Sequence, residues 1–217
     1  NIKAAHRAGA LCVNHAEAVA LRPGVTTVRD TLGGSEHSVR ARVVVNACGP
    51  WVEDICARAG VRGGPRLRLT KGVHLVVPHE RLPIRNAVVR TTRDKRSVFA
   101  IPRDGMTYLG TTDTDFPKAE DHPAVTAADA DYLIEAANRT FAGTPLSRAD
   151  IVASWAGLRP LLHQEGKSPS EISRRDEMLT DPSTGLISIA GGKLTGYRRM
   201  AERVVDHVSE QLGRTLL

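Results

Sequence analysis

Short runs of alternating or continuous apolar residues predict more strands than helices in this chain. The predicted strands cover residues 10–13, 16–21, 25–29, 39–47, 67–78, 88–91, 97–101, 107–110, 151–158 and 185–190. Helical spacing of apolar residues predicts helices at 2–8, 52–59, 126–141 and 194–212. Because strands cluster with few helices between them, the order favours antiparallel or mixed sheets and an α+β fold.

Three local signals refine this outline. Val43-Val44-Val45 is continuously apolar, which is typical of a strand buried on both faces. Thr126 precedes a helical pattern and Asp129 follows three residues later, which predicts a capping box. Pro160 follows the strand at 151–158 and predicts that this strand ends there.

The segment GGKLTGYR, residues 191–198, follows the apolar strand at 185–190 and opens a helical pattern. A strand–diglycine–helix turn directs backbone N–H groups and the positive end of a helix dipole at whatever lies above it. Glycine also lets a flat or anionic ligand approach the backbone closely. Lys193 and Arg198 add positive charge, and a lysine at a helix start opposes the dipole. The turn therefore predicts an anion or cofactor site.

Composition narrows the class of protein. The chain has 217 residues, of which 41% are hydrophobic and 25% charged, as in an ordinary soluble globular protein. The net charge is +6, but the basic residues are scattered, and no zinc-finger spacing or RNA-binding aromatic motif accompanies them. We therefore expect no nucleic-acid partner. No apolar run reaches the roughly 18 residues of a membrane span.

The cysteines indicate the redox compartment of the protein, and the first residues indicate whether the sequence is part of a longer one. Cys12, Cys48 and Cys56 have no metal-ligand spacing and read as buried thiols in a reducing compartment, so we expect no metal site. The first residues look like part of a helix, and the G-x-G-x-x-G dinucleotide fingerprint is absent. Both features are expected of a piece of a longer protein.

A set of motifs in fixed order resembles the FAD-dependent, quinone-linked glycerol-3-phosphate dehydrogenases. The motifs are NACGPW (46–51), LTKGVHLVVP (69–78), IPRDGMTYLGTTDTDF (101–116), WAGLRPL (155–161), SRRDE (173–177) and GGKLTGYR (191–198). The resemblance covers residues 1 to about 210, the middle and C-terminal catalytic portion of such enzymes. The N-terminal fingerprint and the C-terminal helical domain of the family are missing.

The resemblance implies a fold and a division of the chain into two domains. The fold would combine a flavin domain of the glutathione-reductase and D-amino-acid-oxidase kind with a substrate domain on a mixed or antiparallel sheet. Residues 1–66 and 179–217 would form part of the FAD-binding domain. Residues 67–178 would form the substrate-binding domain.

The resemblance also implies roles for single residues. His74 is the candidate general base, and Arg159, Arg174 and Lys193 would hold the substrate phosphate. The residues expected at the cofactor are Gly49, Trp51, Gly191, Gly192, Lys193, Leu194 and Thr195. Two readings stay open from the residues themselves. Lys71 is either a second basic group or merely exposed. Thr111-Thr112-Asp113 is either a structural turn whose hydroxyls and carboxylate bond backbone or a segment with a direct substrate role.

The implied activity is oxidation of sn-glycerol 3-phosphate to dihydroxyacetone phosphate, with hydride passing to flavin N5 and electrons to a quinone, or to oxygen in oxidase relatives. The full-length protein would be cytoplasmic, with peripheral association at the inner face of the plasma membrane. This chain alone is expected to be inactive. Two alternatives remain: an amine or amino-acid oxidase of the same superfamily, and an inactive fragment that only binds phosphate ligands.

Overall fold

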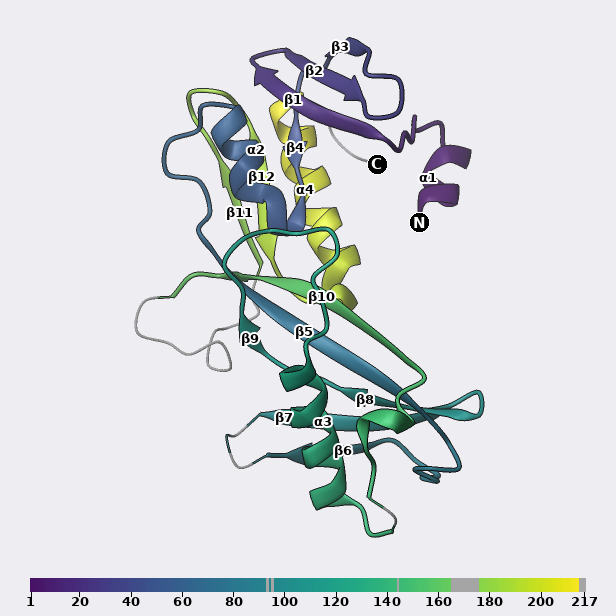
Figure 1. Ribbon diagram of the computed structural model, residues 1–217. Helices are drawn as coiled ribbons and strands as arrows, with labels where there is room; N and C mark the ends of the chain where they lie inside the picture. Colours follow the sequence, from purple (N-terminus) through teal and green to yellow (C-terminus); the bar gives the residue numbers. More distant parts are fainter. Residues whose placement is uncertain (93, 95, 144, 165–175, 215–217) are drawn as a thin grey trace. The chain divides into compact units, whose positions relative to one another are not determined.

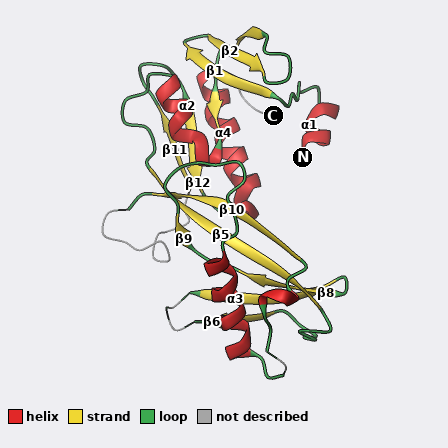
Figure 2. Ribbon diagram, in the orientation of Figure 1, coloured by secondary structure: helices red, strands yellow, loops and turns green. Residues whose placement is uncertain are grey.

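The computed structural model describes residues 1–92, 94, 96–143, 145–164 and 176–214 (Figure 1). The chain divides into two compact units, one made of residues 1–65 and 176–217, the other of residues 66–175. The first unit is therefore built from both ends of the chain. Both units combine strands with helices (Figure 2), as the α+β prediction requires.

The first unit contains two three-stranded sheets. Its elements are α1 (Ile2–Arg7), β1 (Ala16–Arg22), β2 (Val25–Asp30), β3 (Glu36–Arg40), β4 (Val45–Asn46), η1 (Gly49–Trp51), α2 (Val52–Arg58), β11 (Asp176–Thr180), β12 (Ile187–Gly191), η3 (Leu194–Gly196) and α4 (Tyr197–Gln211). One sheet has the antiparallel order β1-β2-β3, and the other has the order β11-β12-β4. In the second sheet β4 runs parallel to β12, although about 140 residues separate them in sequence.

The strand predicted over residues 39–47 is wrong, because two strands of different sheets share that stretch. Ala41 still donates its N–H to Gly24 O at 3.2 Å, beside the β2–β3 ladder. The chain then bends before β4 begins at Val45. Among the described strands β4 pairs only with β12, so Val45 is 38% exposed rather than buried on both faces. The strand predicted at 10–13 is also absent from the described residues.

The core of the first unit gathers around β12, its central strand. Ile187 is fully buried and Ile189 is 8% exposed. Val52 and Cys56 of α2 and Val204 of α4 are also buried. The continuous apolar run before the diglycine is thus explained by burial on both faces. The prediction of three buried thiols is wrong for Cys12 and Cys48, which are exposed.

The second unit is a six-stranded antiparallel sheet with one helix on it. Its elements are β5 (Leu67–Pro78), β6 (Val88–Thr91), β7 (Ser97–Arg103), β8 (Met106–Gly110), β9 (Thr114–Asp115), α3 (Ala127–Thr140), η2 (Arg148–Asp150) and β10 (Ala153–Leu162). The strand order is β10-β5-β8-β7-β6, and β9 also pairs with β5.

Alternation along β5 divides its side chains between the two faces of this sheet. Val73, Leu75 and Val77 are buried in one cluster with Leu133 and Ala137 of α3. Residues 70, 72 and 74 therefore lie on the opposite face, away from α3. This second face carries the candidate chemistry.

The start of α3 confirms the predicted capping box and settles the place of Lys71. The Thr126 hydroxyl accepts from Asp129 N, and the Asp129 carboxylate accepts from Thr126 N at 2.8 Å.

Lys71 is buried, and its Nζ pairs with Oδ2 of the Asp129 carboxylate at 2.6 Å. Lys71 is therefore neither exposed nor on the face of His74. Its ion pair joins β5 to α3.

Pro160 does not end its strand, so that prediction is wrong. The strand β10 runs through Pro160, which pairs with Leu69, and ends at Leu162. The strand β10 lies at an edge of the sheet, where the missing N–H of proline costs no ladder hydrogen bond.

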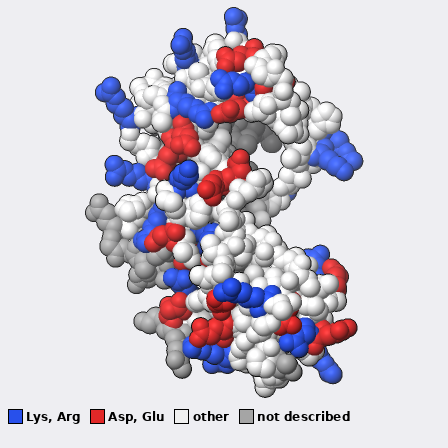
Figure 3. Space-filling view, in the orientation of Figure 1, with Lys and Arg blue, Asp and Glu red and all other residues white. Residues whose placement is uncertain are grey.

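Lys and Arg lie among Asp and Glu on the face shown in Figure 3, without one continuous basic patch. No described helix is both long enough and apolar enough to cross a membrane.

Candidate active site

His74 lies in the middle of the sheet of the second unit, on the face away from α3 and between two aromatic side chains. The β-ladders align Trp155 of β10, His74 of β5, Gly110 of β8 and Phe99 of β7 in one row. The imidazole stacks on the Trp155 ring at 5.0 Å between centroids and 10° between planes, and it lies 5.5 Å from the Phe99 ring. A Cβ added at Gly110 would lie 2.8 Å from His74 Nε2. The glycine is therefore what leaves room for the imidazole.

The surroundings of His74 keep its imidazole neutral. Burial, and next the positive charge of Arg159, lower the pKa of His74 below its ordinary value of 6.5. The Nδ1 atom is buried and has no hydrogen-bond partner among the described residues. A neutral imidazole offers one ring nitrogen as an acceptor. His74 can therefore take a proton at neutral pH.

Arg159 lies on the same face, at the position of β10 opposite Thr70. Its Nη1 donates to Thr112 O at 3.0 Å and to Asp113 Oδ1 at 3.3 Å, and its Nη2 donates to Thr111 Oγ1 at 2.7 Å. Its side chain is 22% exposed. The sheet thus presents a fixed guanidinium near a neutral imidazole.

The hydroxyls of the turn at residues 111–113 bond backbone, as predicted, but the carboxylate of the turn does not. Thr112 is buried, and its hydroxyl donates to Lys71 O at 3.1 Å and accepts from Val73 N at 3.0 Å. The carboxylate of Asp113 was expected to bond backbone and instead pairs with Arg159. A sequence pattern cannot show this pairing, because 46 residues separate the two side chains.

The first unit brings two glycine turns to one edge of its sheet. Because β4 and β12 are parallel, their C-terminal ends meet at the same edge, where α/β proteins commonly bind ligands. The turn after β4 contains Gly49 at φ +55°, with open space where a Cβ would lie. Gly191 ends β12 at φ +76°, and Gly192 follows it at φ +83°. Such conformations favour glycine and leave the backbone accessible.

The residues after the diglycine differ from the prediction at the helix start. Leu194–Gly196 form the 3-10 turn η3, and α4 begins only at Tyr197. Lys193 is therefore the N-cap of η3, three residues farther from the α-helix dipole than expected, and it is exposed like Leu194 and Thr195. A 3-10 turn closes its hydrogen bond over three residues and not four, so it fits the short stretch between β12 and α4.

Asn46 is a positioning residue that the sequence prediction missed. It is 1% exposed, and its Nδ2 donates to Val52 O at 2.9 Å and to Ser188 Oγ at 3.3 Å. Its Oδ1 accepts from Cys48 N at 3.4 Å. One side chain thus ties the turn containing Gly49 to β12. A polar residue ending an apolar strand directly before a glycine turn was the available signal.

We expect Asn46→Ala to lower the free energy of unfolding by about 1–3 kcal/mol, because it removes a buried amide and leaves its partners unsatisfied. Chemical denaturation monitored by circular dichroism measures this loss. The control Asn14→Ala removes an exposed amide of the same unit and should change stability by less than about 0.5 kcal/mol. Equal effects of the two substitutions would show that Asn46 does not organise the turn.

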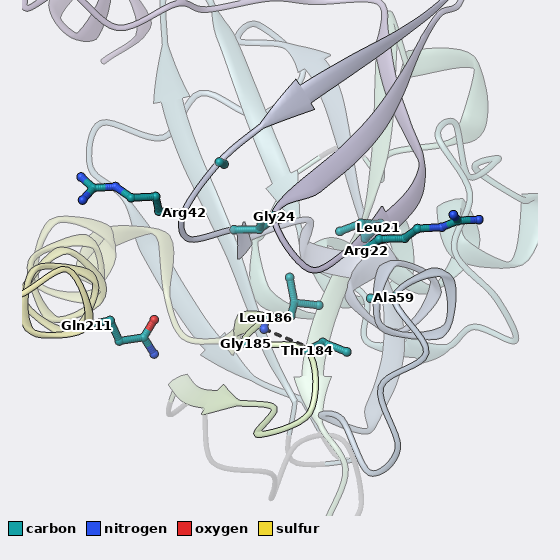
Figure 4. Close-up of a pocket in the computed structure, with 11 residues that line it drawn as sticks. Leu21, Arg22, Gly24, Arg42, Ala59, Thr184, Gly185, Leu186 and Gln211 are labelled. Atoms are coloured by element: carbon teal, nitrogen blue, oxygen red, sulfur yellow. Dashed lines mark hydrogen bonds between the residues drawn. The ribbon is translucent and has the colours of Figure 1, made fainter.

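A small pocket of about 90 Å³ in the first unit does not coincide with these turns. Gly185 and Leu186, which line it, precede β12, so the pocket lies at the strand's other end from Gly191. Figure 4 shows the side chains of Arg22 and Arg42 pointing away from Leu186 in opposite directions. No residue predicted for catalysis or cofactor binding lines this pocket.

The predicted site residues therefore fall into two groups. His74 and Arg159 are brought together on the sheet of the second unit. Gly49, Trp51 and residues 191–195 lie at one strand edge of the first unit. Arg174 lies outside the described residues. Within the described part of the chain, no group of three or more His, Cys, Asp or Glu side chains could hold a metal ion.

Comparison with known proteins identifies the family. A family model described as FAD dependent oxidoreductase matches residues 1–198. The chain belongs to the FAD-dependent oxidoreductases. The family prediction and the α+β fold are confirmed, and FAD is the cofactor of this family.

Individual members of the FAD-dependent oxidoreductases match closely. The chain is 51% identical over 185 residues to the aerobic glycerol-3-phosphate dehydrogenase of Bacillus subtilis (strain 168), covering 85% of this chain and 33% of the relative. It is 48% identical over 186 residues to the enzyme of the same name from Staphylococcus aureus (strain USA300), with the same 85% and 33% coverage. The chain spans about a third of the length of these curated relatives.

A solved structure shows the same fold. It is the glycerol-3-phosphate dehydrogenase from Bacillus halodurans complexed with FAD, with a TM-score of 0.89 and 42% identity. The alignment covers 100% of this chain and 42% of that chain.

Proposed function

We propose that this chain is the catalytic portion of an FAD-dependent enzyme that oxidises sn-glycerol 3-phosphate to dihydroxyacetone phosphate. The observation that carries the proposal is the neutral imidazole of His74 beside the guanidinium of Arg159 on one sheet face. An alcohol oxidation needs a base for the hydroxyl proton, and a phosphorylated substrate needs a cation. The names of the relatives from Bacillus subtilis and Staphylococcus aureus support the same substrate.

His74 would act as the general base. Its neutral ring can accept the proton of the C2 hydroxyl, and positioned proton transfer of this kind contributes about 10²–10⁴-fold to rate. The stacked Trp155 ring and the space over Gly110 hold the imidazole in one orientation. Orientation matters because proton transfer requires the acceptor nitrogen within hydrogen-bond reach of the hydroxyl.

Arg159 would bind the substrate phosphate. A guanidinium forms charge-assisted, bidentate hydrogen bonds with phosphate oxygens, and these fix direction as well as distance. The resemblance to the glycerol-3-phosphate dehydrogenases supports Arg174 and Lys193 as further phosphate ligands. The second unit is accordingly the substrate-binding unit in this proposal.

The first unit would hold the cofactor, with Gly49, Trp51, Gly191, Gly192, Lys193, Leu194 and Thr195 as its contacts. The fit rests on the two glycine turns at the end of parallel strands, where positive φ angles and the open space at Gly49 leave backbone N–H groups accessible. Gly192 has a second reason to be glycine, since a Cβ there would lie 2.5 Å from Met200 Sδ. A bound FAD would supply the acceptor for the hydride that leaves C2.

The electron acceptor and the cellular setting follow from the resemblance alone. The word aerobic in the relatives' names supports an acceptor used in aerobic metabolism, and we propose a quinone. A quinone acceptor in turn supports a cytoplasmic enzyme associated peripherally with the membrane that contains the quinone.

A substrate panel tests the proposed reaction. Full-length protein loaded with FAD should oxidise glycerol 3-phosphate and should have far lower kcat/KM for glycerol, sarcosine and D-alanine. Dye-linked assays under air exclusion give all four values on one preparation. Preferred oxidation of sarcosine or D-alanine would replace the proposal with an amine or amino-acid oxidase, and phosphate binding without turnover would identify a non-enzymatic binding protein.

Lys193→Met in the full-length protein should lower kcat/KM for glycerol 3-phosphate by about tenfold or more, the loss of roughly 1.4 kcal/mol of transition-state interaction. Its melting temperature should stay unchanged, because Lys193 is exposed and lies four residues before the first residue of α4. The control Arg199→Met removes an exposed cation that pairs with Glu202 at 2.6 Å and should leave turnover unchanged. A Lys193→Met protein that melts lower and turns over normally would make Lys193 a structural residue.

A further inference from the structure

We infer that the segment Thr111–Asp113, together with Gly72, forms a built seat that aims Arg159 and thereby sets the preference for a phosphorylated substrate. We call these four residues the arginine seat. Thr111 and Asp113 are then positioning residues that act through Arg159. This inference rests on the proposed function, since it assigns a source for the specificity of that same site.

The arginine seat arises from an irregularity in the sheet. On β5, His74 pairs with Gly110 and Lys71 pairs with Thr114. Two residues of β5 therefore face the three residues of Thr111–Asp113. This one extra residue between β8 and β9 interrupts the pairing with β5 as a β-bulge does, and bulges re-aim side chains and occur often beside active sites.

The bulge is anchored in the core of the second unit. Where the ladder is interrupted, the Thr112 hydroxyl replaces it by accepting from Val73 N at 3.0 Å and donating to Lys71 O at 3.1 Å. Thr112 is 2% exposed. Because its side chain points inward, its carbonyl oxygen is available to Arg159 Nη1 at 3.0 Å.

Among the described residues, three oxygens and one glycine hold the guanidinium of Arg159. Thr111 Oγ1, Thr112 O and Asp113 Oδ1 accept from Arg159 at 2.7, 3.0 and 3.3 Å. Beneath it, a Cβ added at Gly72 would lie 2.5 Å from Arg159 Cζ. The planar fork of arginine loses less freedom on binding when it is already held in place. The seat therefore orients the group that would meet the phosphate.

Two glycines paired across the ladder provide a matched test. Gly72 lies directly opposite Gly157. A Cβ at Gly72 would collide with the Arg159 guanidinium, whereas no atom lies within 4 Å of a Cβ at Gly157. Gly72→Ala should therefore displace the far end of the arginine without removing its charge, and Gly157→Ala should leave it seated.

The measurement is kcat/KM for glycerol 3-phosphate divided by kcat/KM for glycerol, in full-length FAD-loaded protein. We expect Gly72→Ala to lower this ratio by about tenfold or more, as for the loss of one charge-assisted contact. Gly157→Ala should leave the ratio within about twofold, a difference of roughly 0.4 kcal/mol.

The hydroxyl of Thr111 gives a second test that does not depend on a glycine substitution. Thr111→Val keeps the shape and removes the acceptor of the 2.7 Å hydrogen bond, so the ratio should fall severalfold, as for one lost hydrogen bond. Thr111→Ser restores a hydroxyl and should restore the ratio. Asp113→Asn should also lower it. The control is Asp150→Asn, which breaks the ion pair of Asp150 with Arg81. The side chains of Asp150 and Asp113 are both 14% exposed. Asp150→Asn should lower stability and leave the ratio unchanged.

These outcomes separate the inference from the proposed function. A wild-type protein that does not oxidise glycerol 3-phosphate would overturn both. A wild-type protein that prefers glycerol 3-phosphate, with Gly72→Ala and Thr111→Val variants that keep the wild-type ratio, would overturn the arginine seat alone. Equal losses for both substrates in these variants would also overturn it, because they would show a general structural role.

Discussion

His74→Asn in the full-length protein should lower kcat for glycerol 3-phosphate by about 10²–10⁴-fold, the usual contribution of a general base. The reason is that asparagine fits between Trp155 and Gly110 but cannot accept the hydroxyl proton. KM should change little, since Arg159 remains to bind the phosphate. Steady-state kinetics with the flavin content of each preparation measured gives both values.

The control for this prediction is His79→Asn. His79 follows β5 and uses its backbone N–H, not its side chain, to bond Gly105 O at 3.0 Å. It should retain normal kcat. A His74→Asn enzyme with kcat within about threefold of wild type, a difference of roughly 0.7 kcal/mol, would exclude His74 as the base.

The pH dependence follows from the lowered pKa of His74. The base must be deprotonated, so activity should rise with pH through an apparent pKa below 6.5 and then level off. This acidic limb should vanish in His74→Asn. The folded state also disfavours the protonated ring, so the stability contribution of neutral His74 is present above pH 6.5 and is lost as pH falls through the folded pKa.

Arg159→Ala should raise the apparent Kd for glycerol 3-phosphate by about 10- to 150-fold, because one charge-assisted contact to phosphate contributes roughly 1.5–3 kcal/mol. Glycerol, which lacks the phosphate, should lose little. Arg159→Lys should recover only part of the affinity, since it restores the charge without the bidentate fork. Inhibition by dihydroxyacetone phosphate and steady-state kinetics report the affinity.

The control for Arg159 is Arg148→Ala, which removes an exposed arginine paired with Asp131 in the same unit. It should leave both substrates unaffected. Equal losses for glycerol 3-phosphate and glycerol in Arg159→Ala would show that this arginine acts through folding, and the phosphate site would then have to be placed elsewhere.

Features set by neighbours in sequence were predictable. The Thr126–Asp129 capping box depends on residues three apart, and the structure confirms it. The diglycine after an apolar strand requires positive φ angles, which Gly191 and Gly192 adopt. Local chemistry decides such features, so the order of residues is enough to find them.

Features set by strand pairing were not predictable from the sequence alone. Pro160 can continue its strand because β10 is an edge strand. The secondary structure of residues 39–47 depends on which sheet each part of the segment joins. Asn46 gains its role only when Ser188 comes beside it, 142 residues away. Lys71 likewise meets Asp129 only through the packing of α3 on the sheet. Each of these outcomes is fixed by long-range contacts that no local pattern encodes.

A crystal structure of the full-length, FAD-loaded protein with bound dihydroxyacetone phosphate would test the account most directly, because it shows where phosphate and reacting carbon lie. We expect a phosphate oxygen within hydrogen-bond distance, about 2.7–3.2 Å, of the Arg159 guanidinium, and the C2 oxygen at a similar distance from His74. A phosphate bound away from Arg159, with the C2 oxygen out of reach of His74, would contradict the proposed site.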